Sequence, residues 1–174
     1  MTIEETLENT VGLPKVGISR QKLLPAQGQG RVSPGYAVEE LWYKLLARPW
    51  SCLAVVSPHR TPNTLRLTRS LAEFGTQHRQ HPVEVIEGMQ LDVKRSAAIA
   101  QMLKPQGDVP RLSDPRFIIA LDSPIANPIA IGLLRASDAA LMLLEKGVTL
   151  IPQARRVIEI VGPERLVGAV LVVD

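Results

Sequence analysis

The feature that most constrains the fold is a regular alternation of short aliphatic runs and longer amphipathic segments over residues 36–174. The runs have the length of strands and are rich in Val, Ile, Leu and Ala: 51–57, 83–87, 116–122, 138–145 and 166–173. Segments with apolar residues at helical spacing precede or separate them: 37–47, 63–79, 92–104, 126–136 and 149–162. Strands that alternate with helices predict a mostly parallel sheet with helices on both faces, a three-layer α/β sandwich.

The composition agrees with a sheet that is covered on both faces. Apolar residues make up 45% of the 174 residues, which excludes a disordered chain, whereas aromatic residues make up only 3%. An aliphatic core of this kind is typical of buried parallel strands. The lone Cys52 excludes an intrachain disulfide and favours a reducing compartment.

The sequence predicts neither export nor membrane insertion. The first ten residues, MTIEETLENT, are acidic and polar, unlike a secretory signal. The least charged run, 117–134, is interrupted by Asp122, Pro124 and Pro128. We therefore expect a cytoplasmic protein. Glycines and prolines interrupt every periodic pattern in residues 1–35, so we expect a flexible N-terminal arm before a single domain over 36–174.

The net charge of +3 leaves several kinds of partner open. Arginines gather around segment 63–79, where they fit a phosphate, an anionic lipid surface, an acidic partner or a plain solvated face. Nucleic-acid binding is not expected, because a dense basic stripe with interleaved aromatic residues is missing from the sequence.

Ligands of such a sheet bind at the carboxyl ends of the strands, which selects three loops. They are SPHRTPNT (57–64), EGMQ (87–90) and DSPIANP (122–128). The first of them joins a strand to a helix, the junction at which many nucleotide-binding proteins hold phosphates on a glycine-rich loop ending in Gly-Lys-Ser/Thr. This loop contains neither glycine nor lysine.

Three stretches, RFIIALDSPIANP, DAALMLLEKGVT and ERLVGAVLVVD, together with the order of elements, resemble the cytoplasmic domain of bacterial tyrosine kinases of capsule and exopolysaccharide synthesis. Those kinases are P-loop proteins related to the MinD/ParA ATPases. The resemblance covers about residues 36–174 and implies a P-loop NTPase-like fold. It also implies a partner, the cytoplasmic part of an inner-membrane polysaccharide co-polymerase, which would hold the chain peripherally at the inner membrane.

The resemblance assigns nucleotide-site positions residue by residue. Asp122-Ser123-Pro124 matches the end of the family's third strand, whose aspartate belongs to the metal and water site. When Ser70-Leu71-Ala72 is matched to the family's Asn-Leu-Ala, Asn63 takes the place of the last loop glycine. Thr64 then replaces the phosphate-binding lysine, and Leu65 replaces the Ser/Thr that holds magnesium. Glu87 and Met89 stand where the family has an Asp-x-Asp motif. These assignments give a degenerate nucleotide site made of Thr61, Asn63, Thr64, Leu65, Glu87 and Asp122.

The substitutions remove the chemistry of a phosphate loop. Loop glycines let backbone N–H groups converge on phosphates, but Thr61 resists positive φ and Pro62 has no N–H. The lysine's charge is missing at Thr64, and a lost charge-assisted bond of this type forfeits roughly 1.5–3 kcal/mol. Leu65 cannot bind magnesium. We therefore expect no cofactor. Arg60 or Arg66 would replace the lysine's charge only in part, because neither stands at the lysine's position.

Two further features of the family are missing. The kinases carry a C-terminal tyrosine cluster, whereas this sequence has only Tyr36 and Tyr43. Their oligomerisation helix resembles Glu-x-x-Arg-x-x-Arg, but Glu40 is followed at those spacings by Tyr43 and Leu46. Whether the chain forms a homo-oligomer stays open.

Other catalytic or metal-binding arrangements are poorly supported. His59, His78 and His81 lack metal-ligand spacing and are expected to be surface histidines, so no metal site is predicted. Ser57 and Ser123 near His59 sketch a nucleophile and a base, but the Gly-x-Ser-x-Gly elbow is missing.

Three hypotheses result. In the first, the chain is a non-enzymatic partner in polysaccharide export, with contacts expected through the N-terminal arm, Glu40, Trp42, Tyr43 and Trp50. In the second, it is a weak ATPase or tyrosine kinase that holds ATP and magnesium with Asp122, Glu87 and an arginine. In the third, it is a MinD/ParA-like adaptor in another process.

Overall fold

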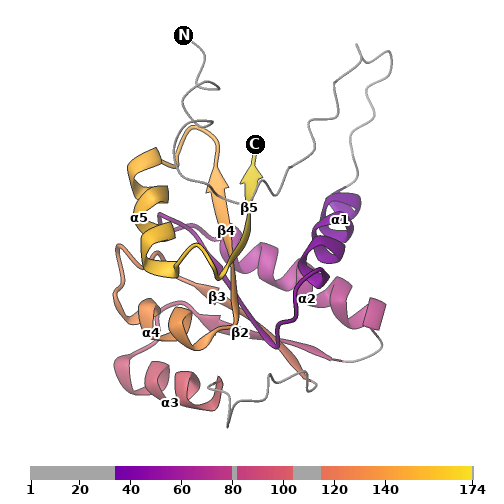
Figure 1. Ribbon diagram of the computed structural model, residues 1–174, viewed down its shortest axis with the longest axis horizontal. Helices are drawn as coiled ribbons and strands as arrows, with labels where there is room; N and C mark the ends of the chain where they lie inside the picture. Colours follow the sequence, from indigo (N-terminus) through magenta and orange to yellow (C-terminus); the bar gives the residue numbers. More distant parts are fainter. Residues whose placement is uncertain (1–33, 80–81, 104–114, 174) are drawn as a thin grey trace. The chain divides into compact units, whose positions relative to one another are not determined.

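The computed structural model describes residues 34–79, 82–103 and 115–173, so nearly all of the expected arm 1–35 lies outside the described residues. Helices and strands alternate along this part of the chain (Figure 1): α1 (Pro34–Leu46), β1 (Cys52–Val56), α2 (Asn63–Arg79), β2 (Val83–Gly88), α3 (Val93–Leu103), β3 (Arg116–Leu121), α4 (Ile129–Ala136), β4 (Ala139–Glu145), α5 (Ile151–Val161) and β5 (Leu166–Val172). The alternation predicted from the sequence is confirmed.

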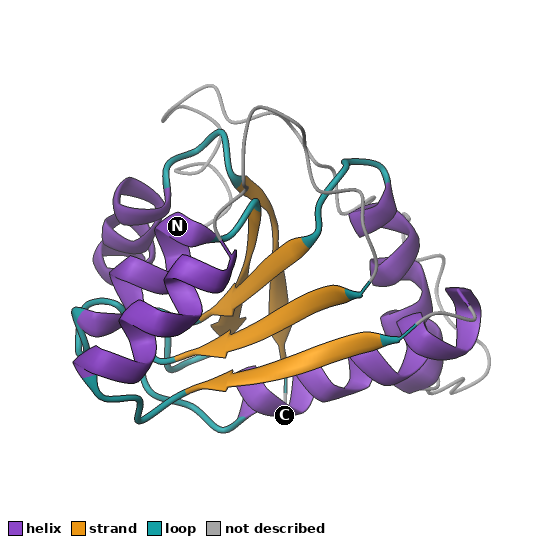
Figure 2. Cartoon of the chain, turned by 90° about the horizontal axis from the view of Figure 1, so that it is seen from below, coloured by secondary structure: helices purple, strands orange, loops and turns teal. Residues whose placement is uncertain are grey.

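The five strands form one parallel sheet in the order β2-β3-β1-β4-β5. The central strand β1 pairs with β3 on one side, where Leu53 faces Ile118, and with β4 on the other, where Leu53 faces Ala139. Figure 2 shows the sheet between its covering helices. The α/β class and the parallel pairing are therefore confirmed.

Helices cover both faces of the sheet because β1 is apolar on both of its faces. Leu53 and Val55 pack in one core cluster with residues of α1 and α2, including Leu45 and Leu71. Alternate residues of the same strand, among them Ala54, pack in a second cluster with residues of α3, α4 and α5 (Leu103, Leu133 and Val157). Successive strand side chains point to opposite faces, so this distribution makes three layers.

The two tryptophans belong to the core. Trp42 is 0% exposed and Trp50 is 2% exposed, and their rings meet edge to face with centroids 5.8 Å apart. The Trp50 indole N–H donates to the Leu45 carbonyl at 2.9 Å. α2 passes so close that a Cβ on Gly75 would lie 2.3 Å from the Trp42 ring. The expectation that Trp42 and Trp50 contact a partner is therefore wrong, because burying these large rings fastens α1 to the sheet.

The helix ends differ in how they are stabilised. The Asp92 carboxylate accepts the Arg95 N–H at 2.7 Å at the start of α3, as expected of an N-cap. Gly162 ends α5 with φ +86°, a conformation that favours glycine. α5 begins after Leu150 without a side-chain cap. Within the described ranges, no helix is long and apolar enough to cross a membrane.

Candidate functional site

The strand order creates a switch point at β1. The chain leaves β1 to build β2 and β3 on one side, and then crosses to β4 on the other. Ligands of open parallel sheets bind outside the carboxyl ends of the strands at such a point. Three groups lie at the carboxyl ends of the strands around this point: the loop after β1, Asp122 after β3, and Glu145 at the end of β4.

The Glu145 carboxylate binds the donors of the loop after β1. His59 Nε2 lies 2.9 Å from one carboxylate oxygen, Oε2. The other oxygen, Oε1, accepts hydrogen bonds from the Thr61 hydroxyl and from the Asn63 side-chain amide, the latter at 2.7 Å. The Glu145 side chain is only 16% exposed and that of His59 only 17%. Three side chains of the loop therefore converge on one anionic group that belongs to the chain itself.

Further hydrogen bonds hold this arrangement from both sides. The Thr149 hydroxyl accepts the Glu145 N–H at 2.8 Å and lies 3.4 Å from His59 Nδ1. On the loop side, the Asn63 N–H donates to the Thr61 hydroxyl oxygen at 3.2 Å. The Thr61 oxygen thus accepts one bond and donates another, which fixes the loop conformation immediately before α2.

These donors make Glu145 an unusually strong acid. Hydrogen bonds from Thr61, then His59 and then Asn63 stabilise the charged form, and together they outweigh the opposing effect of burial. The pKa of Glu145 falls from 4.5 to about 2. The group is therefore a permanent carboxylate at neutral pH.

The positions assigned to the phosphate-binding residues do not offer an equivalent site. Thr64 is 1% exposed in the first turn of α2, and its carbonyl accepts the Thr68 hydroxyl at 2.8 Å. Leu65, which the resemblance matches to the magnesium ligand, is a partly buried apolar side chain. Since Pro62 has no N–H, the loop also lacks one backbone donor that a phosphate loop would use. Thr61 and Asn63 are the members of the predicted set that face an anion, and that anion is Glu145.

Asp122 directly follows β3, on the opposite side of β1 from Glu145, and its environment contrasts with that of Glu145. It is 3% exposed, and its Oδ2 has no hydrogen-bond partner in the described part of the chain. The nearest cation is Arg60, whose guanidinium lies 3.7 Å from Oδ2 and whose side chain is 69% exposed. The adjacent Ser123 hydroxyl donates to the Pro58 carbonyl at 2.7 Å, which ties this strand end to the loop after β1.

Glu87 is directed elsewhere. It lies at the end of the edge strand β2, is 54% exposed, and pairs with Arg69 of α2. β3 separates β2 from β1. Searching residues 34–79, 82–103 and 115–173 finds no group of three His, Cys, Asp or Glu that could hold a metal ion.

The sequence reasoning missed the central residue of the site and misjudged another. His59 was expected at the surface, but it is mostly buried against Glu145, so that expectation is wrong. Glu145 was not selected at all. An acidic residue ending an aliphatic strand is a usable signal, but it becomes informative only once β4 is known to lie beside β1. The sketched nucleophile also fails, because the Ser57 hydroxyl is buried without a hydrogen-bond partner in the described ranges.

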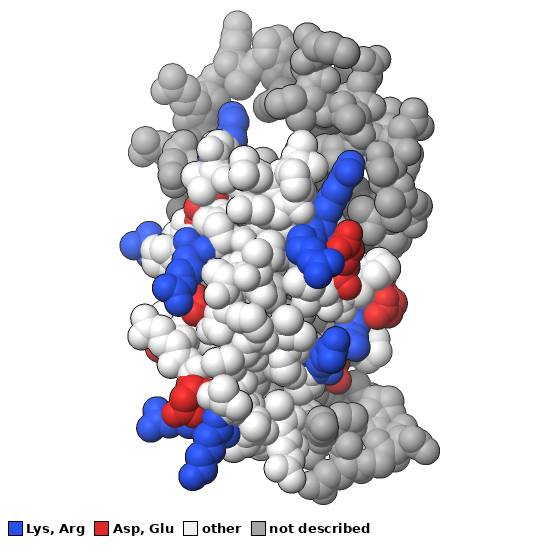
Figure 3. Space-filling view, turned by 90° about the vertical axis from the view of Figure 1, so that its left-hand side faces the viewer, with Lys and Arg blue, Asp and Glu red and all other residues white. Residues whose placement is uncertain are grey.

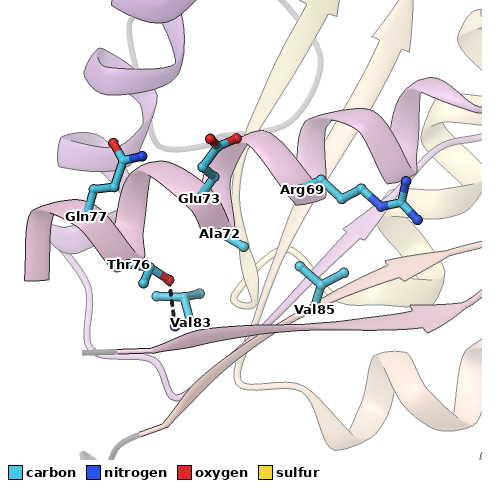
Figure 4. Close-up of a pocket in the computed structure, with 7 residues that line it drawn as sticks. All are labelled: Arg69, Ala72, Glu73, Thr76, Gln77, Val83 and Val85. Atoms are coloured by element: carbon cyan, nitrogen blue, oxygen red, sulfur yellow. Dashed lines mark hydrogen bonds between the residues drawn. The ribbon is translucent and has the colours of Figure 1, made fainter. Parts of the chain in front are cut away.

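A shallow groove lies away from the switch point, between α2 and the edge strand β2 (Figure 4). It is lined by Arg69, Ala72, Glu73, Thr76, Gln77, Val83 and Val85. Figure 3 shows the side of the molecule that carries α3, α4 and α5. Basic and acidic side chains lie beside one another on it, so its surface charge is mixed. This face therefore has no basic stripe of the kind that nucleic acids select.

Comparisons with known proteins add no family: the chain matches no protein-family model and no curated protein. The functional argument consequently rests on the geometry of the loop after β1 and on the resemblance described above.

Proposed function

We propose that this chain is a non-enzymatic, tyrosine-kinase-like protein with a P-loop NTPase-like fold that acts as a partner or regulator in exopolysaccharide or capsule synthesis and export. One observation carries the proposal: the Glu145 carboxylate takes the hydrogen-bond donors of the loop where the related kinases bind phosphates. The loop is thus an internal structural element that joins β1, α2 and β4.

Electrostatics supports this reading. A nucleotide phosphate placed at the loop would lie beside two carboxylates, Glu145 and Asp122, without a lysine to offset its charge. Like charges repel more strongly at the edge of a protein interior than in bulk water, because the effective dielectric constant is lower there. The exposed Arg60 is the nearest compensating group, and it already lies close to Asp122.

The pathway and the partner come from the resemblance. Its natural partner is the cytoplasmic part of an inner-membrane polysaccharide co-polymerase. On α1, Tyr43 is 48% exposed and the Glu40 side chain is 52% exposed, so both remain available for such a contact. A MinD/ParA-like adaptor in another process would share the fold and differ in the partner alone.

Calorimetric titration of the full chain with ATP and with ADP, each with magnesium, tests the proposal. We expect no binding heat at nucleotide concentrations up to about 1 mM, where a functional site would already be saturated. Micromolar binding that is lost in Asp122→Ala would overturn the proposal and favour a weak ATPase or kinase. The observation that speaks for this second function is the buried Asp122 Oδ2 with Arg60 beside it.

A further inference from the structure

The groove between α2 and the edge strand β2 has an apolar floor. Ala72 of α2 and Val83 and Val85 of β2 line it, and Figure 4 shows these side chains directed between the helix and the strand. Glu73 and Gln77 project away from β2 in the same view. The groove has a volume of about 450 Å³, within the range of natural binding sites. It therefore follows a strand, with a helix as its other wall.

The strand wall of this groove is an edge of the sheet. In the described part of the chain β2 pairs with β3 alone. The Phe117 N–H of β3 donates to the Ser51 carbonyl at 2.8 Å, so the Phe117 backbone faces β1. Backbone groups of successive residues point to alternate sides of a strand, so those of Ile118 face β2. The residue of β2 in register with Ile118 is Val85.

This register decides which backbone groups of β2 face outward. A residue of a parallel strand bonds to the two residues that flank its register partner, so Ile118 bonds to Glu84 and Ile86. The N–H and C=O groups of Val85, and by alternation those of Glu87, therefore point away from β3. Outward backbone groups beside an apolar groove are what a peptide uses when it adds a strand to a sheet.

The charges around the groove are mostly acidic. Glu84 and Glu87 are exposed on β2, and Glu73 is exposed on α2. Arg69 is the cation among the described residues that line the groove, and its guanidinium pairs with Glu87. Arg116 of β3 lies over the ring of a buried tryptophan, with its guanidinium carbon 4.7 Å from the ring centroid. The edge therefore presents more carboxylates than cations to a ligand.

The two carboxylates of β2 lie on opposite faces of the sheet. Val85 packs in the core cluster with α1 and α2, whereas Ile86 packs in the cluster with α3. Because successive side chains alternate, Glu87 is on the α2 face and Glu84 is on the α3 face. The pairing of Glu87 with Arg69 of α2 agrees with this. A strand added beside β2 would therefore meet one carboxylate on each face if its basic residues were three positions apart.

We propose that the groove binds an extended segment of another protein, which adds a strand to β2 and carries basic side chains beside Glu84 and Glu87. The backbone groups of Val85 and Glu87 supply the main-chain hydrogen bonds, and an apolar side chain of the segment covers Val85. Opposite charges on neighbouring strands stabilise their pairing, and like charges weaken it. The inference gives the proposed partner role a binding surface but does not depend on the pathway.

The charges favour a basic partner over a second copy of this chain. Pairing of two β2 edges would bring the carboxylates of one copy beside those of the other, which is destabilising. An uncharged strand would desolvate Glu84 and Glu87 without supplying opposite charges. The Val83 N–H already donates to the Thr76 hydroxyl at 2.9 Å, so the main-chain bonds of an added strand begin at Val85.

An NMR titration of the full chain with short peptides tests the proposal. The probes are Lys-Val-Val-Lys-Val and Val-Lys-Val-Val-Lys, blocked at both ends, which match β2 in antiparallel and in parallel orientation. We expect at least one of them to shift the amide signals of Val85 and Glu87, and its glutamate counterpart to bind about tenfold more weakly. Unchanged β2 signals at about 5 mM of either lysine peptide would overturn the proposal, and so would equal binding of the glutamate peptides.

A charge reversal on the surface of β2 tests the recognition without touching the core. Glu84→Lys should weaken binding of the lysine peptide about fivefold and strengthen binding of its glutamate counterpart by a similar factor. Glu164→Lys is the matched control: its side chain is also exposed, at 70%, but it precedes β5 at the other edge of the sheet, so binding should be unchanged. Equal effects of the two lysine substitutions would contradict the proposal.

The main-chain bonds are tested on the peptide itself. N-methylation of the peptide amides that face β2 should abolish the shifts, whereas N-methylation of the alternate amides should preserve them. Equal effects of the two methylation patterns would contradict strand addition, and β2 signals that shift with protein concentration alone would assign the edge to a second copy instead. Because no nucleotide is used, this proposal and the proposed function can fail separately.

Discussion

Two carboxylates stand at the ends of β3 and β4, the strands on either side of β1, and their surroundings are opposite. Glu145 receives hydrogen bonds from the loop after β1, and its pKa falls to about 2. Asp122 is more deeply buried, yet its Oδ2 has no hydrogen-bond partner within the described ranges and only the exposed Arg60 nearby. In the tyrosine kinases that the sequence resembles, the aspartate matched by Asp122 belongs to the metal and water site.

This difference shows that the hydrogen bonds of the loop after β1 are made to an internal carboxylate. The side-chain donors of that loop are engaged by Glu145, whereas in the described part of the chain the Oδ2 of Asp122 has only the Arg60 guanidinium nearby, at 3.7 Å. A buried charge contributes to stability only when its hydrogen bonds are satisfied, so the two residues should respond oppositely to substitution.

The largest effect is expected for Glu145→Ala. Removing the carboxylate leaves the Thr61 and Asn63 donors and the His59 ring without their acceptor in a mostly buried site. We expect the free energy of unfolding to fall by about 2–4 kcal/mol in urea titrations. Glu159→Ala, which removes an exposed partner of Arg156, is the control and should change it by about 0.5 kcal/mol or less. Equal losses in the two variants would contradict the role of Glu145.

The contribution of the Glu145 carboxylate should also appear in the pH dependence of the free energy of unfolding. The folded-state pKa of Glu145, about 2, is below its usual value of 4.5, so its contribution is complete above about pH 4.5 and is lost as the pH falls toward 2. We expect the difference in unfolding free energy between the wild type and Glu145→Gln to narrow over this interval. Urea titrations at several pH values measure it, and a constant difference would show that Glu145 titrates normally.

A smaller effect is expected at the loop itself. Asn63→Ala removes one donor to Glu145 while the Thr61 hydroxyl and the His59 ring remain. We expect a loss of about 1–2 kcal/mol, the range for a hydrogen bond to a charged group. In the Glu145→Ala background the same substitution should cost much less, because the acceptor is already gone. A double-mutant cycle measures this coupling, and additive losses would contradict a direct bond.

The smallest effect, and one of opposite sign, is expected for Asp122→Asn. Removing a buried charge that lacks hydrogen bonds relieves its desolvation cost, so the free energy of unfolding should rise by about 1 kcal/mol or less. A marked loss of stability would mean that Asp122 has a structural role like that of Glu145, and the contrast between the two carboxylates would disappear.

The fold was predictable to a large extent, because its signals are local. The strand segments and the limits of α2 at residues 63–79 follow from periodicity, and Asp92 and Gly162 mark helix ends through their own chemistry. The burial of Trp42 and Trp50 was harder to predict from the sequence, since it depends on how α1 meets α2 at Gly75. Few aromatic residues in a sequence do not imply that they lie at the surface.

The site was predictable only in part. The strand-end argument selected the loops that contain Thr61, Asn63 and Asp122, and the resemblance singled out these residues, but neither selected their partner Glu145. Glu145 is 82 residues from Asn63, and the contact arises from the crossing of the chain to the other side of β1. Strand order is a property of the whole sheet, so the sequence pattern around any one strand does not reveal it.

The most direct test of the account is an NMR titration of the Glu145 side-chain carboxyl carbon, followed with and without ADP and magnesium. If the carboxylate is the permanent acceptor of the loop, its pKa should be about 2, and about 1 mM nucleotide should leave both its pKa and its chemical shift unchanged. An ordinary pKa for Glu145, or one that rises toward the ordinary value when nucleotide is added, would show that the loop is free to bind phosphates and would contradict the account.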